Sequence, residues 1–149
     1  LKDTTSGTYA GLTDVGFGIS QLLPIVVQTM VSKGQLLLIE QPELHLHPAL
    51  QTEIGDMFIR SALGENQNTF MIETHSEHLI LRLLRRVRET TDGELPEGIP
   101  PITPDEVSVL YVKPDEDGAS VIHIPVTEDG DFDGPWPKGF FHERARELF

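Results

Sequence analysis

The fold is decided by the stretch Leu36-Leu-Leu-Ile-Glu-Gln-Pro-Glu-Leu-His-Leu-His-Pro48. Its short apolar start is typical of a β-strand that is buried on both faces. Pro42 has no backbone N–H to donate, so the strand must end before it. Glu40 and Gln41 are therefore expected at the carboxyl end of the strand, where open α/β sheets bind their ligands. The alternative is a core strand that simply ends in polar residues.

The segments on either side of this strand have the periodicity of helices. From about Ile19 to Ser32, apolar residues recur at helical spacing, and Pro24 should bend only the first turn. After the strand, Pro48 suits the first position of another helix, and Gly64 stands where a left-handed cap would end it. The apolar stripe predicted for this second helix consists of Leu50, Ile54, Met57 and Phe58.

A second strand repeats the pattern of the first. Thr69–Glu73 is predicted to be a buried strand, and polar residues again follow it, with His75 among them. The order strand, helix, strand, helix predicts an α/β fold with a parallel sheet, in which the polar ends of both strands meet in one crevice. The core face predicted for the last helix consists of Leu79, Ile80, Leu83, Leu84 and Val87. Its arginines are expected on a solvated face, with nucleic-acid contact as the alternative: Arg82, Arg85, Arg86 and Arg88.

The rest of the chain has a different character. Residues 90–104 contain four prolines and little apolar periodicity, which predicts a linker or an exposed excursion. The β-rich runs 106–113 and 119–124 flank a turn-forming stretch, so they are predicted to form a hairpin. An acidic and aromatic segment follows, and a short helix is expected at about 142–148.

Composition limits the class of protein. A chain of 149 residues with 38% hydrophobic residues can bury one core. The 24 acidic residues outnumber the 11 basic ones and give a net charge of −13, which argues against wrapping of nucleic acid. Without cysteine, disulfides and thiolate zinc sites are excluded, and a reducing cytoplasm is expected. No run is long enough for a membrane span. Because the chain begins at Leu1 rather than at methionine, it is expected to be part of a longer protein.

The order of the motifs in residues 14–89 resembles that of the ABC ATPases. Within them, it is similar to the soluble RecF-like, SMC-like and overcoming-lysogenization-defect ATPases of DNA repair and phage defence. It looks most like bacterial AAA-type ATPases that carry Ile-Glu-Gln-Pro-Glu-Leu-His-Leu-His-Pro and have a small carboxyl-terminal domain of unknown function. The resemblance implies an ATPase part over 1–89, a linker over 90–104, and a hairpin with a small appendage over 105–149.

The resemblance implies roles for the polar residues at the strand ends. Residues 36–41 match the Walker B segment, so Glu40 would hold Mg²⁺, a hard cation that carboxylate oxygens suit. Gln41 stands where most members place the glutamate that activates the attacking water. An amide cannot accept a proton, which implies slow hydrolysis. His75 matches the switch histidine that contacts the γ-phosphate.

The segment 43–47 matches the D-loop, which in these ATPases crosses the dimer interface near the nucleotide of the partner. The resemblance therefore makes His47 a candidate nucleotide contact, and Glu43 an alternative group for positioning water. A different reading of the same residues is a metal hydrolase that uses Glu43, His45 and His47 as ligands. Against it, alternate residues on a helix do not share a face.

Residues 15–18 match the signature motif, with Gly16 in place of the usual serine. The resemblance implies that only backbone amides, those of Gly16 and Gly18, would meet the γ-phosphate of the opposite subunit. The 149 residues contain no Gly-x-x-x-x-Gly-Lys-Ser/Thr motif. The phosphate-binding loop, Walker A, is therefore expected in an amino-terminal lobe outside this chain, and the chain alone is expected to bind ATP weakly.

Taken together, the resemblance implies an ATPase that uses ATP and Mg²⁺, closes as a homodimer around nucleotide, and switches an effector. A protein or DNA partner is expected, and a membrane is not. The alternative is a nucleotide-responsive binding module that hydrolyses ATP slowly or not at all and controls assembly on its partner. Turnover distinguishes the two.

Overall fold

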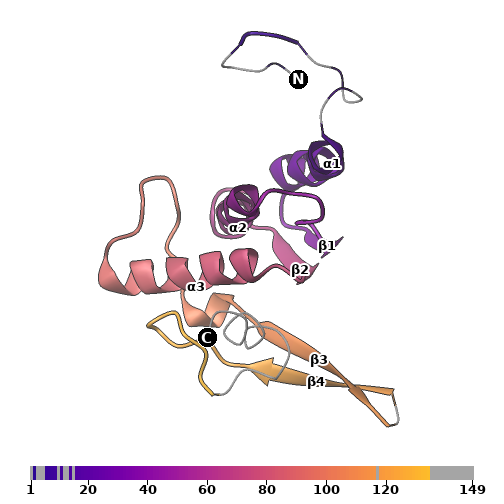
Figure 1. The fold of residues 1–149 in the computed structure, drawn as a ribbon. Coiled ribbons are helices and arrows are strands. Elements are labelled where there is room, and N and C mark those ends of the chain that lie inside the picture. The colour runs from indigo at the N-terminus through magenta and orange to yellow at the C-terminus, as the bar shows by residue number, and fades with distance from the viewer. Residues whose placement is uncertain are drawn as a thin grey trace, which may run out of the picture. The chain divides into compact units, whose positions relative to one another are not determined.

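The structure is a computed structural model that describes residues 2, 6–9, 11, 14, 16–116 and 118–134. The chain forms two compact units, 1–76 and 77–149 (Figure 1). Val15, the segment 135–141 and the helix predicted near 142–148 lie outside the described residues. None of the helices in the described ranges is long and apolar enough to cross a membrane.

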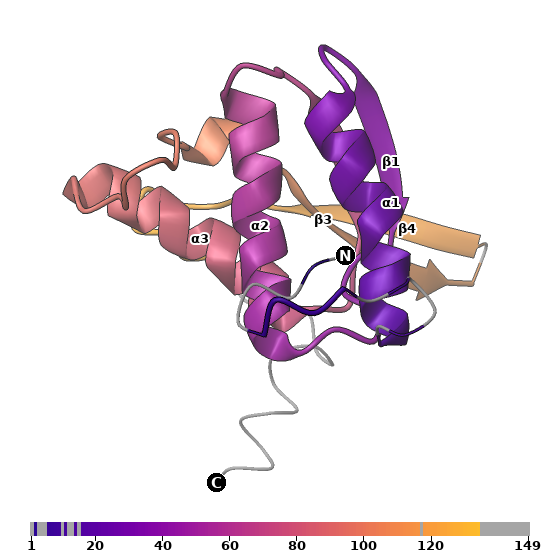
Figure 2. The ribbon, with the colours of Figure 1, turned by 90° about the horizontal axis from the view of Figure 1, so that it is seen from above.

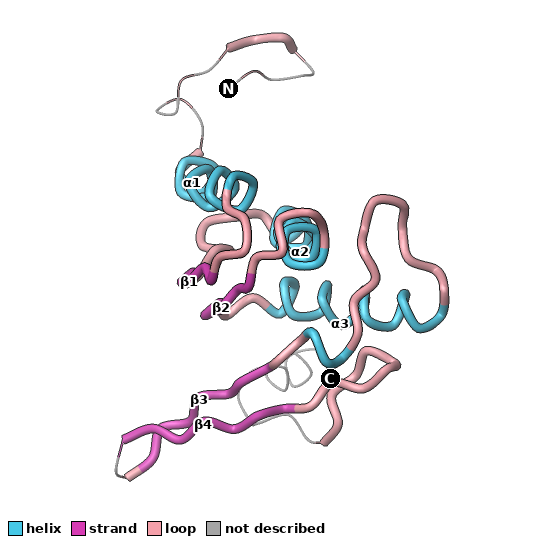
Figure 3. The backbone as a smooth tube through the Cα atoms, turned by 180° about the vertical axis from the view of Figure 1, so that it is seen from behind, coloured by secondary structure: helices cyan, strands magenta, loops and turns pink. Residues whose placement is uncertain are grey.

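The first unit is a small α/β layer. Its elements are α1 (Phe17–Val31), β1 (Leu36–Glu40), α2 (Pro48–Leu63) and β2 (Thr69–Glu73). The two strands pair in parallel, with Leu36 opposite Thr69 and Glu40 opposite Glu73. Both helices lie on the same side of this sheet (Figures 1 and 3). The predicted order of helices and strands and the parallel pairing are therefore confirmed.

The expectation that these strands are buried on both faces is wrong. Leu36, Leu38 and Met71 point away from the helices and remain 62%, 70% and 64% exposed. Their neighbours Leu37 and Ile39 are half-buried on the helix side. The reason is that α1 and α2 cover only one face of the sheet, so alternate residues of each strand stay in solvent.

Two helix boundaries differ from the sequence-based expectation. α1 begins at Phe17, two residues earlier than predicted, and Pro24 lies within it. Gly64 ends α2 with φ −88° and ψ −150°, so it is not a left-handed cap. A Cβ there would lie 2.3 Å from the carbonyl oxygen of Arg60, so a close backbone approach explains the glycine. Leu50 is 41% exposed, and the buried apolar positions of α2 are Ile54, Phe58 and Ile59.

The buried side chain of Asn68 joins the carboxyl-terminal ends of α1 and α2 to the residue before β1. Its Nδ2 donates to the carbonyl oxygen of Ser32 at 2.9 Å and to the hydroxyl of Ser61 at 3.0 Å. Its Oδ1 accepts from the backbone N–H of Gln35 at 3.0 Å. Because Asn68 is only 3% exposed, these bonds replace water and hold α1, α2 and the start of both strands in register.

The second unit combines a helix with a hairpin. Its elements are α3 (Glu77–Asp92), the 3-10 helix η1 (Pro104–Glu106), β3 (Val109–Asp115) and β4 (Gly118–Ile124). The strands pair antiparallel, with Val109 opposite Ile124, which confirms the predicted hairpin (Figure 2). α3 lies in this unit, because the two compact units meet between Ser76 and Glu77 in the chain. The buried apolar residues of α3 are Leu79, Leu84 and Val87, all of them predicted.

The segment after α3 is mostly exposed over residues 91–98, as predicted, but it does not stay exposed over its whole length. Ile99 and Ile102 are only 7% and 4% exposed. The backbone N–H of Ile102 donates to the Thr90 hydroxyl at 3.1 Å, which fastens the segment to α3. Where the chain returns to α3, it places these two isoleucines in the buried region despite the nearby prolines. Sequence periodicity missed them because two isolated isoleucines among prolines form no sustained apolar pattern.

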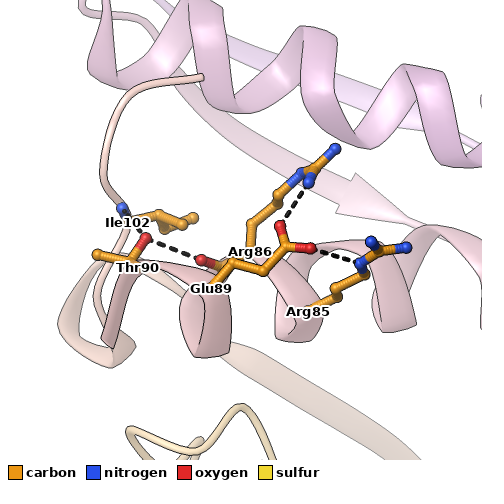
Figure 4. A network of polar contacts seen from close by, with 5 residues as sticks. All are labelled: Arg85, Arg86, Glu89, Thr90 and Ile102. Atoms are coloured by element: carbon orange, nitrogen blue, oxygen red, sulfur yellow. Dashed lines mark hydrogen bonds and ion pairs between the residues drawn. The ribbon is translucent and has the colours of Figure 1, made fainter. Parts of the chain in front are cut away.

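Arg86 corrects the expectation of a solvated arginine face on α3. It is 5% exposed and forms an ion pair with Glu89, to which Arg85 Nε also donates at 2.6 Å (Figure 4). Partial burial raises the pKa of Glu89, but the hydrogen bonds from Arg86 and Arg85 outweigh it. The pKa of Glu89 therefore lies below its usual value.

Replacing Glu89 by glutamine should lower the free energy of unfolding by about 1–2 kcal/mol at neutral pH, since a charge-assisted bond to a buried arginine is lost. This contribution is complete above the ordinary glutamate pKa of 4.5 and disappears as pH falls through the lower pKa of the folded state. Urea unfolding of Glu89→Gln and wild type at neutral and acidic pH measures it. Exposed Glu97 provides the control, Glu97→Gln. A difference that does not change with pH would contradict the assignment.

Candidate functional site

The strands β1 and β2 end side by side. Glu40 and Glu73 are partners in the parallel register, and the N–H of Gln41 continues the ladder by donating to the carbonyl oxygen of Glu73 at 2.8 Å. A cavity of about 460 Å³ opens at this point, between the strand ends and α1. Glu40, Gln41 and Glu73 all line it. This is the edge of a parallel sheet at which α/β proteins bind their ligands.

One carboxylate oxygen links the polar groups of both strand ends. Glu73 Oε1 accepts a hydrogen bond from Gln41 Nε2 at 3.4 Å, and His75 Nε2 lies 3.3 Å from the same atom. The side chains of Glu73 and His75 are 51% and 73% exposed, so both are open to a ligand. His75 does not line the cavity, but its Nε2 lies 3.3 Å from Oε1 of Glu73, which does.

The loop that carries Gln41 has an unusual backbone. Gln41 and His45 have φ values of 46° and 62°, in the left-handed region that residues other than glycine rarely adopt. Such residues cost about 1 kcal/mol or more each and often occur at functional sites. The backbone N–H of Leu44 donates to the backbone carbonyl oxygen of Gln41, and the N–H of Leu46 donates to that of Glu43. These two hydrogen bonds hold the turns in place. The sharp turn keeps the Gln41 side chain at the strand end.

Glu43 joins this loop to the one after β2. Its Oε1 accepts a hydrogen bond from the backbone N–H of His75 at 2.7 Å. Its Oε2 is buried and makes no hydrogen bond within the described part of the chain. Glu43 therefore fixes the backbone at His75, and its carboxylate is not one of the groups that line the cavity.

The start of α1 packs directly on the same loop. A Cβ at Gly18 would lie 2.3 Å from the carbonyl oxygen of His45, whereas one at Gly16 would meet nothing within 4 Å. The ring of Phe17 contacts the His45 imidazole edge to face, with 5.3 Å between centroids. Packing against His45 is thus sufficient reason for a glycine at position 18.

His47 has a local structural role. It is the amino-terminal cap of α2, and its Nδ1 accepts a hydrogen bond from the N–H of Ala49 at 3.2 Å. This bond implies that the neutral imidazole carries its proton on Nε2. The sequence offered one signal for this role, because Pro48 marks the helix start that a preceding residue must cap.

The donor atoms of the site suit magnesium. Mg²⁺ is normally bound by one or two carboxylates together with phosphate oxygens and water. Glu40 and Glu73 both supply carboxylates at the cavity. Within the described residues, no group of three or more His, Cys, Asp or Glu side chains can hold a metal ion. The metal hydrolase reading of Glu43, His45 and His47 therefore has no support there.

Glu73 is the member of this cluster to which sequence reasoning gave no role. The available signal was its position, because it ends β2 as Glu40 ends β1. Only the register shows that the two carboxylates are direct partners across the strands.

Comparison with known families agrees with this geometry. Residues 1–80 match the family model described as AAA ATPase domain, and residues 102–149 match the one described as protein of unknown function (DUF3696). No curated protein and no solved structure matches the chain. The first match covers more than half of the 149 residues and includes both strand ends with the residues gathered around them. The chain therefore belongs to the AAA ATPase domain family and carries a carboxyl-terminal domain of unknown function.

Proposed function

We propose that this chain supplies the catalytic edge of an ABC-type ATPase site, which in the intact protein closes as a nucleotide-sandwiched homodimer and switches an effector. One observation carries the proposal. Glu40, Gln41 and Glu73 line one cavity at the carboxyl ends of parallel strands, with the His75 imidazole 3.3 Å from Glu73. A carboxylate can hold a metal and an exposed imidazole can contact a phosphate, and ATP hydrolysis needs charge stabilisation of this kind at such an edge.

Each residue then has a defined task. Glu40 holds Mg²⁺, which when bound neutralises charge on the phosphate oxygens. His75 donates a hydrogen bond to the γ-phosphate. The contact of its imidazole with Glu73 and the hydrogen bond from its backbone N–H to Glu43 hold it in position. The backbone amides at Gly16 and Gly18 and the imidazole of His47 face the nucleotide of the partner subunit.

The phosphate-binding loop comes from an amino-terminal lobe that this chain does not contain. Parallel sheets are normally covered on both faces, and here the exposed apolar side chains Leu36, Leu38 and Met71 provide the surface that such a lobe would cover. The proposed setting is the cytoplasm, and the effector is a protein or DNA partner in DNA repair or phage defence.

A second candidate function is favoured by Gln41 alone. If no other carboxylate replaces the missing glutamate, hydrolysis is slow and ATP acts as a durable clamp on the dimer. The clamp hypothesis expects Gln41→Glu to accelerate hydrolysis by about 10²-fold or more, since a general base is restored. A rate that stays unchanged or falls in Gln41→Glu excludes the clamp and leaves the ATPase.

The proposed function is tested in the intact protein by sedimentation with and without ATP and Mg²⁺, together with phosphate release. ATP with Mg²⁺ should convert monomer to dimer. His75→Ala should weaken the nucleotide-dependent dimer by about 10- to 100-fold, because a hydrogen bond to a charged phosphate is worth about 1.5–3 kcal/mol.

His123→Ala is the matched control, because His123 is exposed on β4 and has no role in the proposed site. It should dimerise like the wild type. The chain of 149 residues alone should show no micromolar affinity for ATP in calorimetry. A wild-type protein that neither dimerises with ATP nor releases phosphate would refute the proposal.

A further inference from the structure

The position that should hold the catalytic glutamate of this site is occupied by Gln41, whose amide cannot accept a proton from water. A carboxylate nevertheless lies within reach of that amide. Glu73 Oε1 is 3.4 Å from Gln41 Nε2, and it belongs to the neighbouring strand rather than to the Walker B segment. The question is which of the three nearby glutamates can meet a water molecule in the cavity.

The geometry separates these glutamates. Glu43 uses Oε1 to accept from the His75 N–H, while its Oε2 is buried, so neither oxygen faces the cavity. Glu40 lines the cavity, but it is the residue that the proposed function assigns to the metal. Glu73 lines the same cavity and is 51% exposed, and its second oxygen, Oε2, accepts no hydrogen bond from the described part of the chain.

We infer that Glu73 is the general base of the hydrolysis, in place of the glutamate that Gln41 replaces; this inference rests on the proposed function. One Glu73 oxygen accepts a hydrogen bond from Gln41 and lies 3.3 Å from His75 Nε2, and these two contacts hold the carboxylate at the strand end. The other oxygen takes one proton from the attacking water. The water oxygen forms a bond to the γ-phosphorus, and the bond from that phosphorus to the β–γ bridging oxygen breaks, which leaves ADP and inorganic phosphate. The proton passes from Glu73 to solvent before the next cycle.

Gln41 has a defined part in this arrangement. Because its Nε2 donates to Glu73, its amide carbonyl is turned away from Glu73 and can accept a hydrogen bond from the same water. Gln41 thus orients the nucleophile, and Glu73 removes its proton. Gln41→Glu would place a second carboxylate about one hydrogen-bond length from Glu73, and the repulsion between like charges should lower the rate rather than raise it.

The test compares Glu73→Gln with wild type in the intact protein. Glutamine keeps the shape and an acceptor oxygen for Gln41 but accepts no proton. We expect phosphate release to fall about 10²–10⁴-fold, with ATP affinity unchanged within about threefold. The ATP-bound dimer should accumulate, and quenched samples should contain ATP instead of ADP. Glu73→Asp, which retracts the carboxylate by one methylene, should recover part of the rate.

Glu65→Gln is the matched control, because Glu65 is exposed between α2 and β2 and lies outside the site; its rate should equal that of wild type. If wild type hydrolyses ATP and Glu73→Gln does so equally fast, Glu73 is not the base and the proposed ATPase still stands. If Glu73→Gln no longer binds ATP, Glu73 is a binding group and the inference is overturned. A wild-type protein that neither binds nor hydrolyses ATP overturns the proposed function and this inference together.

Discussion

Glu40→Gln should reduce magnesium-dependent ATP hydrolysis by the intact protein about 100-fold or more. Glu40 ends β1 at the edge of the cavity, and the proposed function gives it the metal. A bound metal ion stabilises developing charge by several kcal/mol, and a loss of about 2.7 kcal/mol corresponds to 100-fold in rate. An amide is a weaker ligand for Mg²⁺ than a carboxylate, so the loss should be partly reversed by high magnesium concentration.

The measurement is phosphate release as a function of magnesium concentration. Glu40→Gln should need at least about tenfold more magnesium for its half-maximal rate, since second-shell changes alone already cost 10- to 100-fold in affinity. Glu65→Gln, an exposed change outside the site, should follow the wild-type curve. If Glu40→Gln lowers the maximal rate without changing the magnesium requirement, Glu40 acts on the nucleotide or the water instead of the metal.

Gly18→Ala should lower the free energy of unfolding by about 2–3 kcal/mol. The added Cβ would lie 2.3 Å from the carbonyl oxygen of His45, a backbone atom that cannot move away by a rotamer change. Overpacking of this kind costs about 1–3 kcal/mol, and the rigid neighbour puts Gly18 at the upper end. α1 or the loop after β1 must shift to relieve the contact.

Gly16→Ala provides the matched comparison within the same turn. Gly16 has φ −55°, which any residue adopts, and a Cβ there meets nothing within 4 Å. Its substitution should lower stability by only about 0.5–1 kcal/mol, as expected for glycine to alanine at a helix amino-terminal cap. Urea unfolding of both variants measures the difference. Equal stabilities would show that α1 does not rest on the loop at His45.

How much of the fold was evident from the sequence depends on the range of the interactions. Local patterns were sufficient for the elements of the first unit, because Pro42 limits β1, Pro48 starts α2, and apolar runs of strand length mark β1 and β2. They also placed Glu40 and Gln41 at the end of a strand. The alternation of helix and strand was sufficient for a parallel pairing, since a crossover of this length returns the chain in the same direction.

Burial was predicted less well because it depends on what covers each surface. The alternate residues of β1 are apolar on both sides, so the sequence could not indicate that only one side faces helices. Ile99 and Ile102 are isolated apolar residues in a proline-rich segment, and they are buried where the chain returns to α3. Arg86 reads as a surface residue, and its burial follows from the nearby Glu89 carboxylate, which compensates its charge.

The sequence by itself determined the chemistry at the ends of the strands: a carboxylate at position 40, an amide at position 41 and an imidazole at position 75. Only the tertiary structure decided how they meet. The parallel register sets Glu40 opposite Glu73, and a contact between residues 32 positions apart brings Gln41 to the same Glu73 oxygen that His75, two residues further on, approaches. Such contacts depend on strand pairing and loop geometry, which have no signature in a local stretch of sequence. For this reason Glu73, unremarkable in the sequence, became central in the structure.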